Sequence, residues 1–141
     1  MKTVLALSGS SNRGKSTTLN LVIDLLKAAY PHAQVEERRY KVDRTFVLVI
    51  DGRKVGVETQ GDPASRLPTS LKRFVDAGCE VIVCACRSYG ATTQSVEDLA
   101  TRDYAIQWFA KDRSDHVADQ ARDNADVAKR IFEAVHRALD E

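Results

Sequence analysis

The chain has little excess charge of either sign and few residues that mark an unusual class of protein. Its 21 Lys and Arg residues nearly balance 20 Asp and Glu residues, which leaves a net charge of +1. A broadly basic surface for nucleic acid or for an acidic membrane is therefore not indicated, and any anion has to be bound locally. Aromatic residues make up only 6%, whereas apolar residues at 43% and charged residues at 29% are typical of a globular domain.

Long apolar runs are also missing. No stretch approaches the roughly 18 residues that a membrane-spanning helix needs. The segment from Met1 to Leu7 is too short for a secretory signal and lacks a small-residue cleavage site. We therefore expect a cytoplasmic protein without a membrane partner.

Cysteine is scarce, with three residues at Cys79, Cys84 and Cys86. The odd number and the spacing match neither a disulfide framework nor a Cys-x-x-Cys metal motif. Buried thiols are the expected interpretation. The three histidines lie far apart in the sequence, so a metal held by protein side chains alone is not expected.

Short apolar runs alternate with amphipathic stretches, which is typical of an α/β domain. With 141 residues the chain fits one domain, residues 1–141, with a mostly parallel sheet of about five strands, an antiparallel hairpin and helices on both faces. Asp51-Gly52 predicts the hairpin turn, because both central residues of a type I′ turn need positive φ. A short edge strand around Val35 is also expected. Strands are predicted at 3–7, 45–50, 53–59, 81–86 and 103–110, and helices at 15–29, 68–77, 93–101 and from about 114.

One motif carries chemistry. Gly9-Ser10-Ser11-Asn12-Arg13-Gly14-Lys15-Ser16 fits G-x-x-x-x-G-K-[ST] at every specified position and lies between a predicted strand and a predicted helix. The glycines allow close approach of the backbone, whose amides point at phosphates together with the helix N-terminus. Lys15 then contacts the β- and γ-phosphates, and the Ser16 hydroxyl is a ligand for Mg²⁺.

These residues resemble the Walker A motif of the P-loop NTPase superfamily, and the element order is similar to that of a small-GTPase-type domain. The resemblance implies a three-layer P-loop sandwich that binds a nucleoside triphosphate with Mg²⁺. The implied nucleotide-binding residues are Gly9, Ser10, Ser11, Asn12, Arg13, Gly14, Lys15, Ser16 and Thr17.

The resemblance also calls for an acidic residue at the end of a strand beside the P-loop strand. Asp51 follows four apolar residues, but its place in Asp51-Gly52 is explained by the hairpin turn, at the far end of the sheet from the phosphates. Small GTPases carry D-x-x-G at the end of the next strand, where this chain has Glu58-x-x-Gly61 followed by Asp62. We therefore favour Glu58 and Asp62 over Asp51, although Asp62 before Pro63 also fits a helix N-cap.

Two further parts of the sequence bear on catalysis and on which nucleotide base is recognised. Arg87 follows the predicted strand 81–86 and is a candidate for stabilising the γ-phosphate, with a solvated loop arginine as the alternative. The guanine-binding N/T-K-x-D motif would fall at Ala110-Lys111-Asp112-Arg113, which matches at Lys111 but has Ala and Arg at the other two specified positions. ATP is therefore expected rather than GTP.

Three functions remain open at this point. The first is Mg²⁺-dependent ATP binding and slow hydrolysis, with residues 31–44 and 60–68 responding to the γ-phosphate. The second is a small kinase in which Arg66, Arg87 and Arg102 clamp a nucleotide or metabolite acceptor. The third is a nucleotide-binding module without turnover that acts through a protein partner or as a homodimer.

Overall fold

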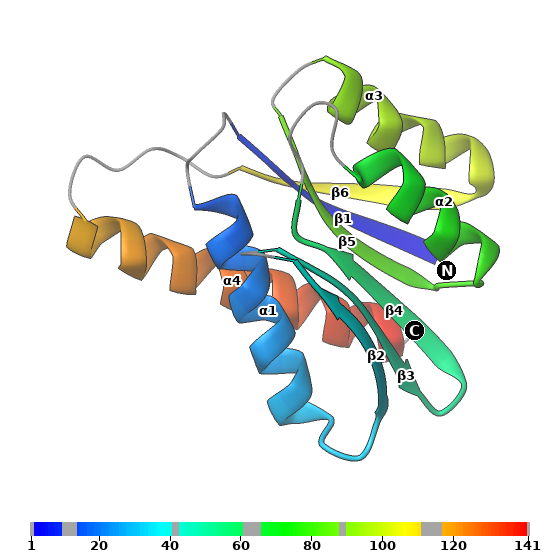
Figure 1. The fold of residues 1–141 in the computed structure, drawn as a ribbon, viewed down its shortest axis with the longest axis horizontal. Coiled ribbons are helices and arrows are strands. Elements are labelled where there is room, and N and C mark those ends of the chain that lie inside the picture. Colours follow the sequence, from blue (N-terminus) through cyan, green and yellow to red (C-terminus); the bar gives the residue numbers. More distant parts are fainter. Residues whose placement is uncertain are drawn as a thin grey trace.

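A computed structural model of the chain describes residues 2–9, 14–40, 43–60, 66–87, 90–110 and 117–140. These residues form one mixed β-sheet with helices packed on it (Figure 1). No helix within these ranges is both long and apolar enough to cross a membrane. The elements in chain order are β1 (Lys2–Ser8), α1 (Lys15–Ala29), β2 (Gln34–Arg39), β3 (Arg44–Ile50), β4 (Arg53–Glu58), α2 (Leu67–Asp76), β5 (Val81–Cys86), α3 (Ala91–Glu97), the 3-10 helix η1 (Asp98–Arg102), β6 (Tyr104–Ala110) and α4 (Val117–Asp140).

The six strands lie in the order β2-β3-β4-β5-β1-β6. The pairings β4 with β5, β5 with β1 and β1 with β6 are parallel, whereas β2 with β3 and β3 with β4 are antiparallel. The sheet is therefore mixed, with one more strand than the roughly five predicted. Strand β5 separates the hairpin from β1, because Val83 is opposite Leu5 on one side and Val57 on the other. The end of β4 thus lies one strand away from β1.

Helices cover both faces of the sheet, as the alternation of the sequence predicted. Helices α1 and α4 pack on one face, and α2 and α3 pack on the other (Figure 1). Along β4, Val55 and Val57 belong to the core under α1 and α4, so Gly56 and Glu58 face α2. Since both faces are buried, the central strands are nearly continuous apolar runs.

The hairpin between β3 and β4 confirms the turn predicted from Asp51-Gly52. Asp51 has φ 51° and Gly52 has φ 81°, so both central residues are in the left-handed region that a type I′ turn requires. Strand β4 runs parallel to β5, and β5 runs parallel to β1. The turn before β4 therefore lies at the sheet edge opposite the carboxyl end of β1, which places Asp51 away from Gly9 and from the start of α1.

The three cysteines are buried, as expected. Burial raises the pKa of the Cys79 thiol to about 11 and also raises the pKa of Cys84 and Cys86. These side chains therefore stay protonated at neutral pH and act as small apolar groups in the core.

Gly56 lets α2 pack directly on the sheet. A Cβ atom at this position would lie 2.7 Å from two ring carbons of the buried Phe74 side chain. We expect Gly56→Ala to lower the free energy of unfolding by about 2–3 kcal/mol, since overpacking forces the ring and α2 away from the sheet. Urea denaturation measures this loss.

A double-mutant cycle with Phe74→Leu separates this contact from a general loss of backbone freedom. If Phe74 causes the clash, Gly56→Ala costs less in the Phe74→Leu background than in the wild type. Equal costs in the two backgrounds would contradict the assignment of the clash to the Phe74 ring.

Candidate functional site

The described residues of the motif are Gly9, directly after β1, and Gly14, Lys15 and Ser16, where α1 begins. Gly14 precedes α1 with φ 80°, a left-handed conformation that favours glycine. A Cβ atom on Gly14 would lie 2.7 Å from Oδ1 of Asn124, a buried side chain of α4. Backbone conformation and space therefore both require glycine at this turn.

Lys15 is buried although it carries a charge, with 6% of the residue exposed. Its Nζ donates to the carbonyl oxygen of Gly9 at 2.8 Å and to that of Cys86 at 2.9 Å. Gly9 directly follows β1 and Cys86 ends β5, so the ammonium group lies between the carboxyl ends of two adjacent parallel strands. The structure thus places the positive charge at the sheet edge where ligands bind in open α/β folds.

Ser16 contacts an acidic residue that the sequence interpretation missed. Its Oγ lies 2.9 Å from Oδ1 of Asp43 and 3.2 Å from the carbonyl oxygen of Thr59. The Thr59 hydroxyl donates to the same Asp43 oxygen at 2.7 Å. Asp43 directly precedes β3 and Thr59 directly follows β4. The antiparallel pairing of these strands therefore holds the acid beside Ser16.

Glu58, one of the two favoured acids, faces the other side of the sheet. It is fully buried, and its carboxylate accepts from the hydroxyl of Ser70 at 2.6 Å and from that of Thr45 at 2.8 Å. Arg66 lies 3.4 Å from both carboxylate oxygens. The structure brings Glu58 together with α2 rather than with Ser16, because adjacent residues of a strand point to opposite faces.

Two other predicted residues, Thr17 and Arg87, lie at the same edge of the sheet as Lys15. Thr17 is exposed on the first turn of α1, whereas the buried Thr18 donates its hydroxyl to the carbonyl oxygen of Gly14 at 2.7 Å. This leaves Thr17 as the threonine accessible to a ligand. Arg87 directly follows Cys86, the residue whose carbonyl oxygen accepts from Lys15, and its backbone N–H donates to Thr92. Arg87 therefore comes from the same strand end as the lysine contact.

Several predicted site residues lie outside the residues that the structure describes. They are Ser10, Ser11, Asn12 and Arg13 of the P-loop motif, Asp62, which was predicted to bind the metal, and residues 111–113, which were compared with the guanine-binding motif.

The oxygen atoms around Ser16 fit Mg²⁺. Mg²⁺ prefers hard oxygen ligands and is usually held by one or two carboxylates together with phosphates and water. Asp43 supplies a carboxylate, Ser16 a hydroxyl, and Thr59 a hydroxyl and a carbonyl oxygen. No group of three or more His, Cys, Asp or Glu residues that could hold a metal occurs in the described part of the chain.

Comparisons of the chain with protein-family models, with curated proteins and with solved structures found no match.

Proposed function

We propose that this chain is a P-loop domain that binds a nucleoside triphosphate with Mg²⁺ and hydrolyses it slowly. The observation that supports this most strongly is the arrangement of Lys15 and Ser16. The lysine ammonium lies at the carboxyl ends of β1 and β5, and the serine hydroxyl lies 2.9 Å from the Asp43 carboxylate. A P-loop motif that served only as a glycine turn would not require an acid beside its serine.

In this proposal the N-terminus of α1 binds the phosphates. The first backbone N–H groups of a helix have no partner within the helix, and their dipoles attract anions. No acidic side chain lies in the first turn of α1 to compete with the phosphates. Lys15 exchanges its carbonyl partners for phosphate oxygens, which form stronger charge-assisted hydrogen bonds.

Asp43 takes the part that the sequence interpretation gave to Glu58, while Asp62, the other predicted acid, lies outside the described residues. Its carboxylate and the Ser16 hydroxyl would hold Mg²⁺, which when bound neutralises negative charge on the phosphate oxygens. Glu58 keeps α2 attached to the sheet through Ser70 and Arg66. Its role in this proposal is therefore structural.

ATP is the proposed nucleotide. The guanine-binding motif is incomplete at Ala110-Lys111-Asp112-Arg113, since Ala and Arg occupy two of its three specified positions. The incomplete match argues against GTP, so ATP remains the expected nucleotide.

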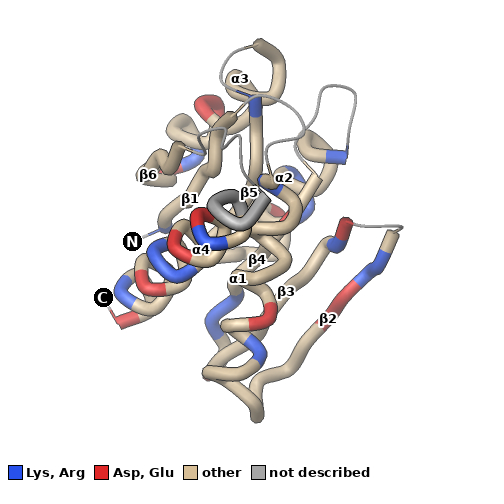
Figure 2. The backbone as a smooth tube through the Cα atoms, turned by 90° about the vertical axis from the view of Figure 1, so that its left-hand side faces the viewer, with Lys and Arg blue, Asp and Glu red and all other residues tan. Residues whose placement is uncertain are grey.

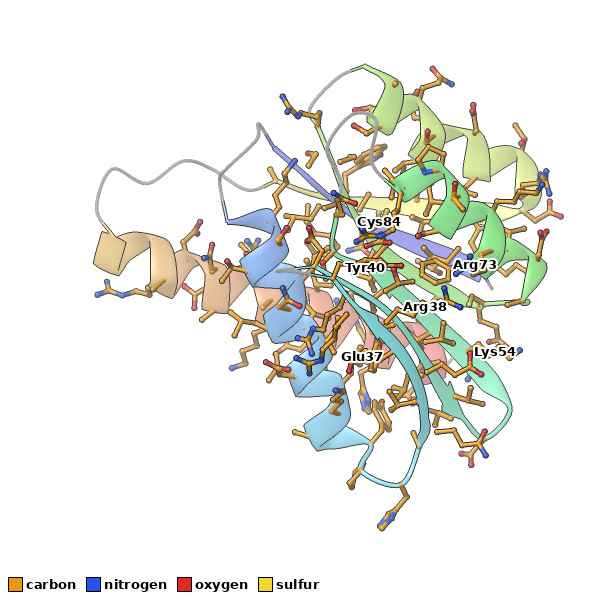
Figure 3. The ribbon with its side chains drawn as sticks, in the orientation of Figure 1. Glu37, Arg38, Tyr40, Lys54, Arg73 and Cys84 are labelled. Atoms are coloured by element: carbon orange, nitrogen blue, oxygen red, sulfur yellow. The ribbon has the colours of Figure 1, made fainter. Side chains whose placement is uncertain are left out.

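The segment 31–44, which contains β2, and the segment 60–68, which ends at the start of α2, remain our candidates for the parts of the chain that respond to the γ-phosphate. The first contains Asp43 and Tyr40, and the second contains Arg66. The Arg66 guanidinium lies 3.5 Å from the centre of the Tyr40 ring while it also pairs with Glu58. Figure 3 shows Tyr40 on the side of the sheet toward α2, whereas Glu37, which pairs with Lys27 of α1, faces the other way. The backbone N–H of Tyr40 donates to the carbonyl oxygen of Asp43 at 2.8 Å, so a movement of Asp43 toward bound Mg²⁺ would reach α2 through Tyr40 and Arg66, where a protein partner can detect it.

The kinase alternative has less support, because its three arginines come from different places. Arg66 is paired with Glu58, and Arg102 ends η1 before the start of β6. Since β6 runs parallel to β1, Arg102 lies at the edge opposite the P-loop. Of the three, Arg87 directly follows Cys86, whose carbonyl oxygen accepts from Lys15.

Calorimetry with a non-hydrolysable ATP analogue tests the proposal on the wild-type chain. We expect one binding event per chain, with weaker binding when EDTA removes Mg²⁺ and weaker binding of the matching GTP analogue. Absence of binding heat for either analogue at millimolar nucleotide would refute the proposed function.

A further inference from the structure

The two edges of the sheet differ in charge. Strand β2 forms one edge with the sequence QVEERR, so four of its six residues are charged. Figure 2 shows this mixture of acidic and basic residues along β2. Strand β6 forms the other edge with the sequence YAIQWFA, which has no charged residue over seven positions. Charges on an edge strand oppose pairing with another chain, so β2 is protected in this way and β6 is not.

Strand β6 is also accessible. It pairs with β1 through its whole length and has no strand on its other side within the described part of the chain. Ala105, Gln107, Trp108 and Ala110 are exposed, and Trp108 keeps 44% of its surface accessible. An uncharged edge of this length offers unpaired backbone groups beside apolar side chains, which is the arrangement that strand addition uses.

We propose that two copies of this chain associate through antiparallel pairing of their β6 strands, which joins two six-stranded sheets into one continuous sheet. The composition of β6 favours a second copy of this chain as the source of the strand that pairs with it. A second copy offers a strand of the same length with no charge to be desolvated, whereas charged side chains are one of the devices by which other proteins protect their edge strands.

The symmetry of such a dimer fixes the pairing register. A two-fold axis perpendicular to the sheet maps each face onto itself, so the axis passes through a residue and its copy. All seven residues of β6 find a partner only when that residue is Gln107, the middle of the strand. Ile106 then lies opposite Trp108 of the second copy, and such pairs of aromatic and β-branched residues stabilise antiparallel strands.

This arrangement separates the two proposed nucleotide sites. Antiparallel pairing reverses the strand direction, so the carboxyl ends of β1 in the two copies lie at opposite edges of the joined sheet. Neither copy would supply a residue to the other copy's P-loop. Dimerisation is therefore independent of the proposed nucleotide chemistry, and either proposal can fail without the other.

Sedimentation velocity on the nucleotide-free chain tests the dimer. Strand pairing of this length buries less than the roughly 1,600 Å² of a standard interface, so we expect dissociation in the micromolar range. Trp108 is the only tryptophan, so its emission should shift to shorter wavelength over the same concentrations as the dimer forms. A wild-type chain that sediments as a monomer up to about 100 μM would overturn the proposal.

A charge swap at Gln107 tests the register. In Gln107→Lys two lysines would lie opposite each other at the two-fold axis, and we expect the dissociation constant to rise at least roughly fivefold. Gln107→Glu should have the same effect through two carboxylates. An equimolar mixture of the two variants should restore dimers, because lysine then lies opposite glutamate.

Gln34→Lys is the matched control, because it places the same charge on the exposed edge strand β2. We expect it to sediment like the wild type. Dimers of Gln107→Lys as stable as those of the wild type would overturn the proposed interface, and failure of the mixture to restore dimers would overturn the pairing centred on Gln107.

Discussion

Lys15→Ala should abolish nucleotide binding and hydrolysis. We expect the dissociation constant for the Mg²⁺-ATP analogue to rise at least about 100-fold, which corresponds to roughly 2.7 kcal/mol. The ammonium group is the one positive charge described within the P-loop turn and the first turn of α1, and hydrogen bonds between a charged donor and phosphate are about twice as strong as neutral ones. Calorimetry measures the affinity, and release of inorganic phosphate measures the turnover.

The stability of this variant has to be measured with its affinity. Lys15 is buried and satisfies the carbonyl oxygens of Gly9 and Cys86, so its removal leaves two acceptors without this donor. We expect a loss of about 1–3 kcal/mol in the free energy of unfolding. Urea denaturation then shows whether the variant is still folded under the conditions of the binding experiment.

Lys27→Ala is the control on the same helix. This lysine lies three turns further along α1, with 35% of its side chain exposed, and pairs with Glu37. We expect its nucleotide affinity to equal that of the wild type, since surface ion pairs contribute about 1 kcal/mol or less and this one lies away from the P-loop. Equal losses in the two lysine variants would contradict a specific role for Lys15.

Features that depend on local sequence were predicted well. Helix α1 begins at Lys15 and ends at Ala29, as its apolar spacing predicted, because Tyr30-Pro31 follows directly. The Asp51-Gly52 turn was predicted because few residue pairs adopt two positive φ angles. In both cases a few neighbouring residues determine the backbone conformation.

The order of the strands could not be predicted in the same way. The sequence gives strands and helices in chain order, but the position of β5 between β4 and β1 depends on contacts between residues about 25 and 80 positions apart, such as Val57 with Val83 and Leu5 with Val83. The face of the sheet on which the Glu58 side chain lies could not be predicted either, for a related reason. Both faces of β4 are buried, so its sequence lacks the polar alternation that would show which side each residue occupies.

Asp43 was missed because nothing in the sequence around it indicates a metal ligand. It lies in the polar segment 31–44, at the start of a strand rather than at the end of one. Its position beside Ser16 follows from the pairing of β3 with β4, which places Arg44 near Thr59. A search for an acid at strand ends alone does not find it.

Asp43→Asn should remove most of the dependence of nucleotide binding on Mg²⁺. An asparagine keeps the shape and one oxygen but lacks the negative charge that attracts the cation. We expect hydrolysis to fall about 100-fold, within the range found when a single group that stabilises charge in a transition state is removed. Affinity for the nucleotide in EDTA should stay near the wild-type value. Calorimetric titrations with and without Mg²⁺ measure both quantities.

Glu58→Gln distinguishes the role of Glu58 from that of Asp43, because the geometry predicts a loss of stability for one variant and a loss of Mg²⁺ dependence for the other. Glu58 accepts hydrogen bonds from Thr45, Ser70 and Arg66 while fully buried, so its loss of charge should lower the free energy of unfolding by about 1–3 kcal/mol. Nucleotide binding by Glu58→Gln should depend on Mg²⁺ as it does in the wild type, since the Glu58 carboxylate faces α2. If Glu58→Gln lost the Mg²⁺ dependence and Asp43→Asn kept it, the metal would belong on the α2 side of the sheet, and the contact between Ser16 and Asp43 would be structural.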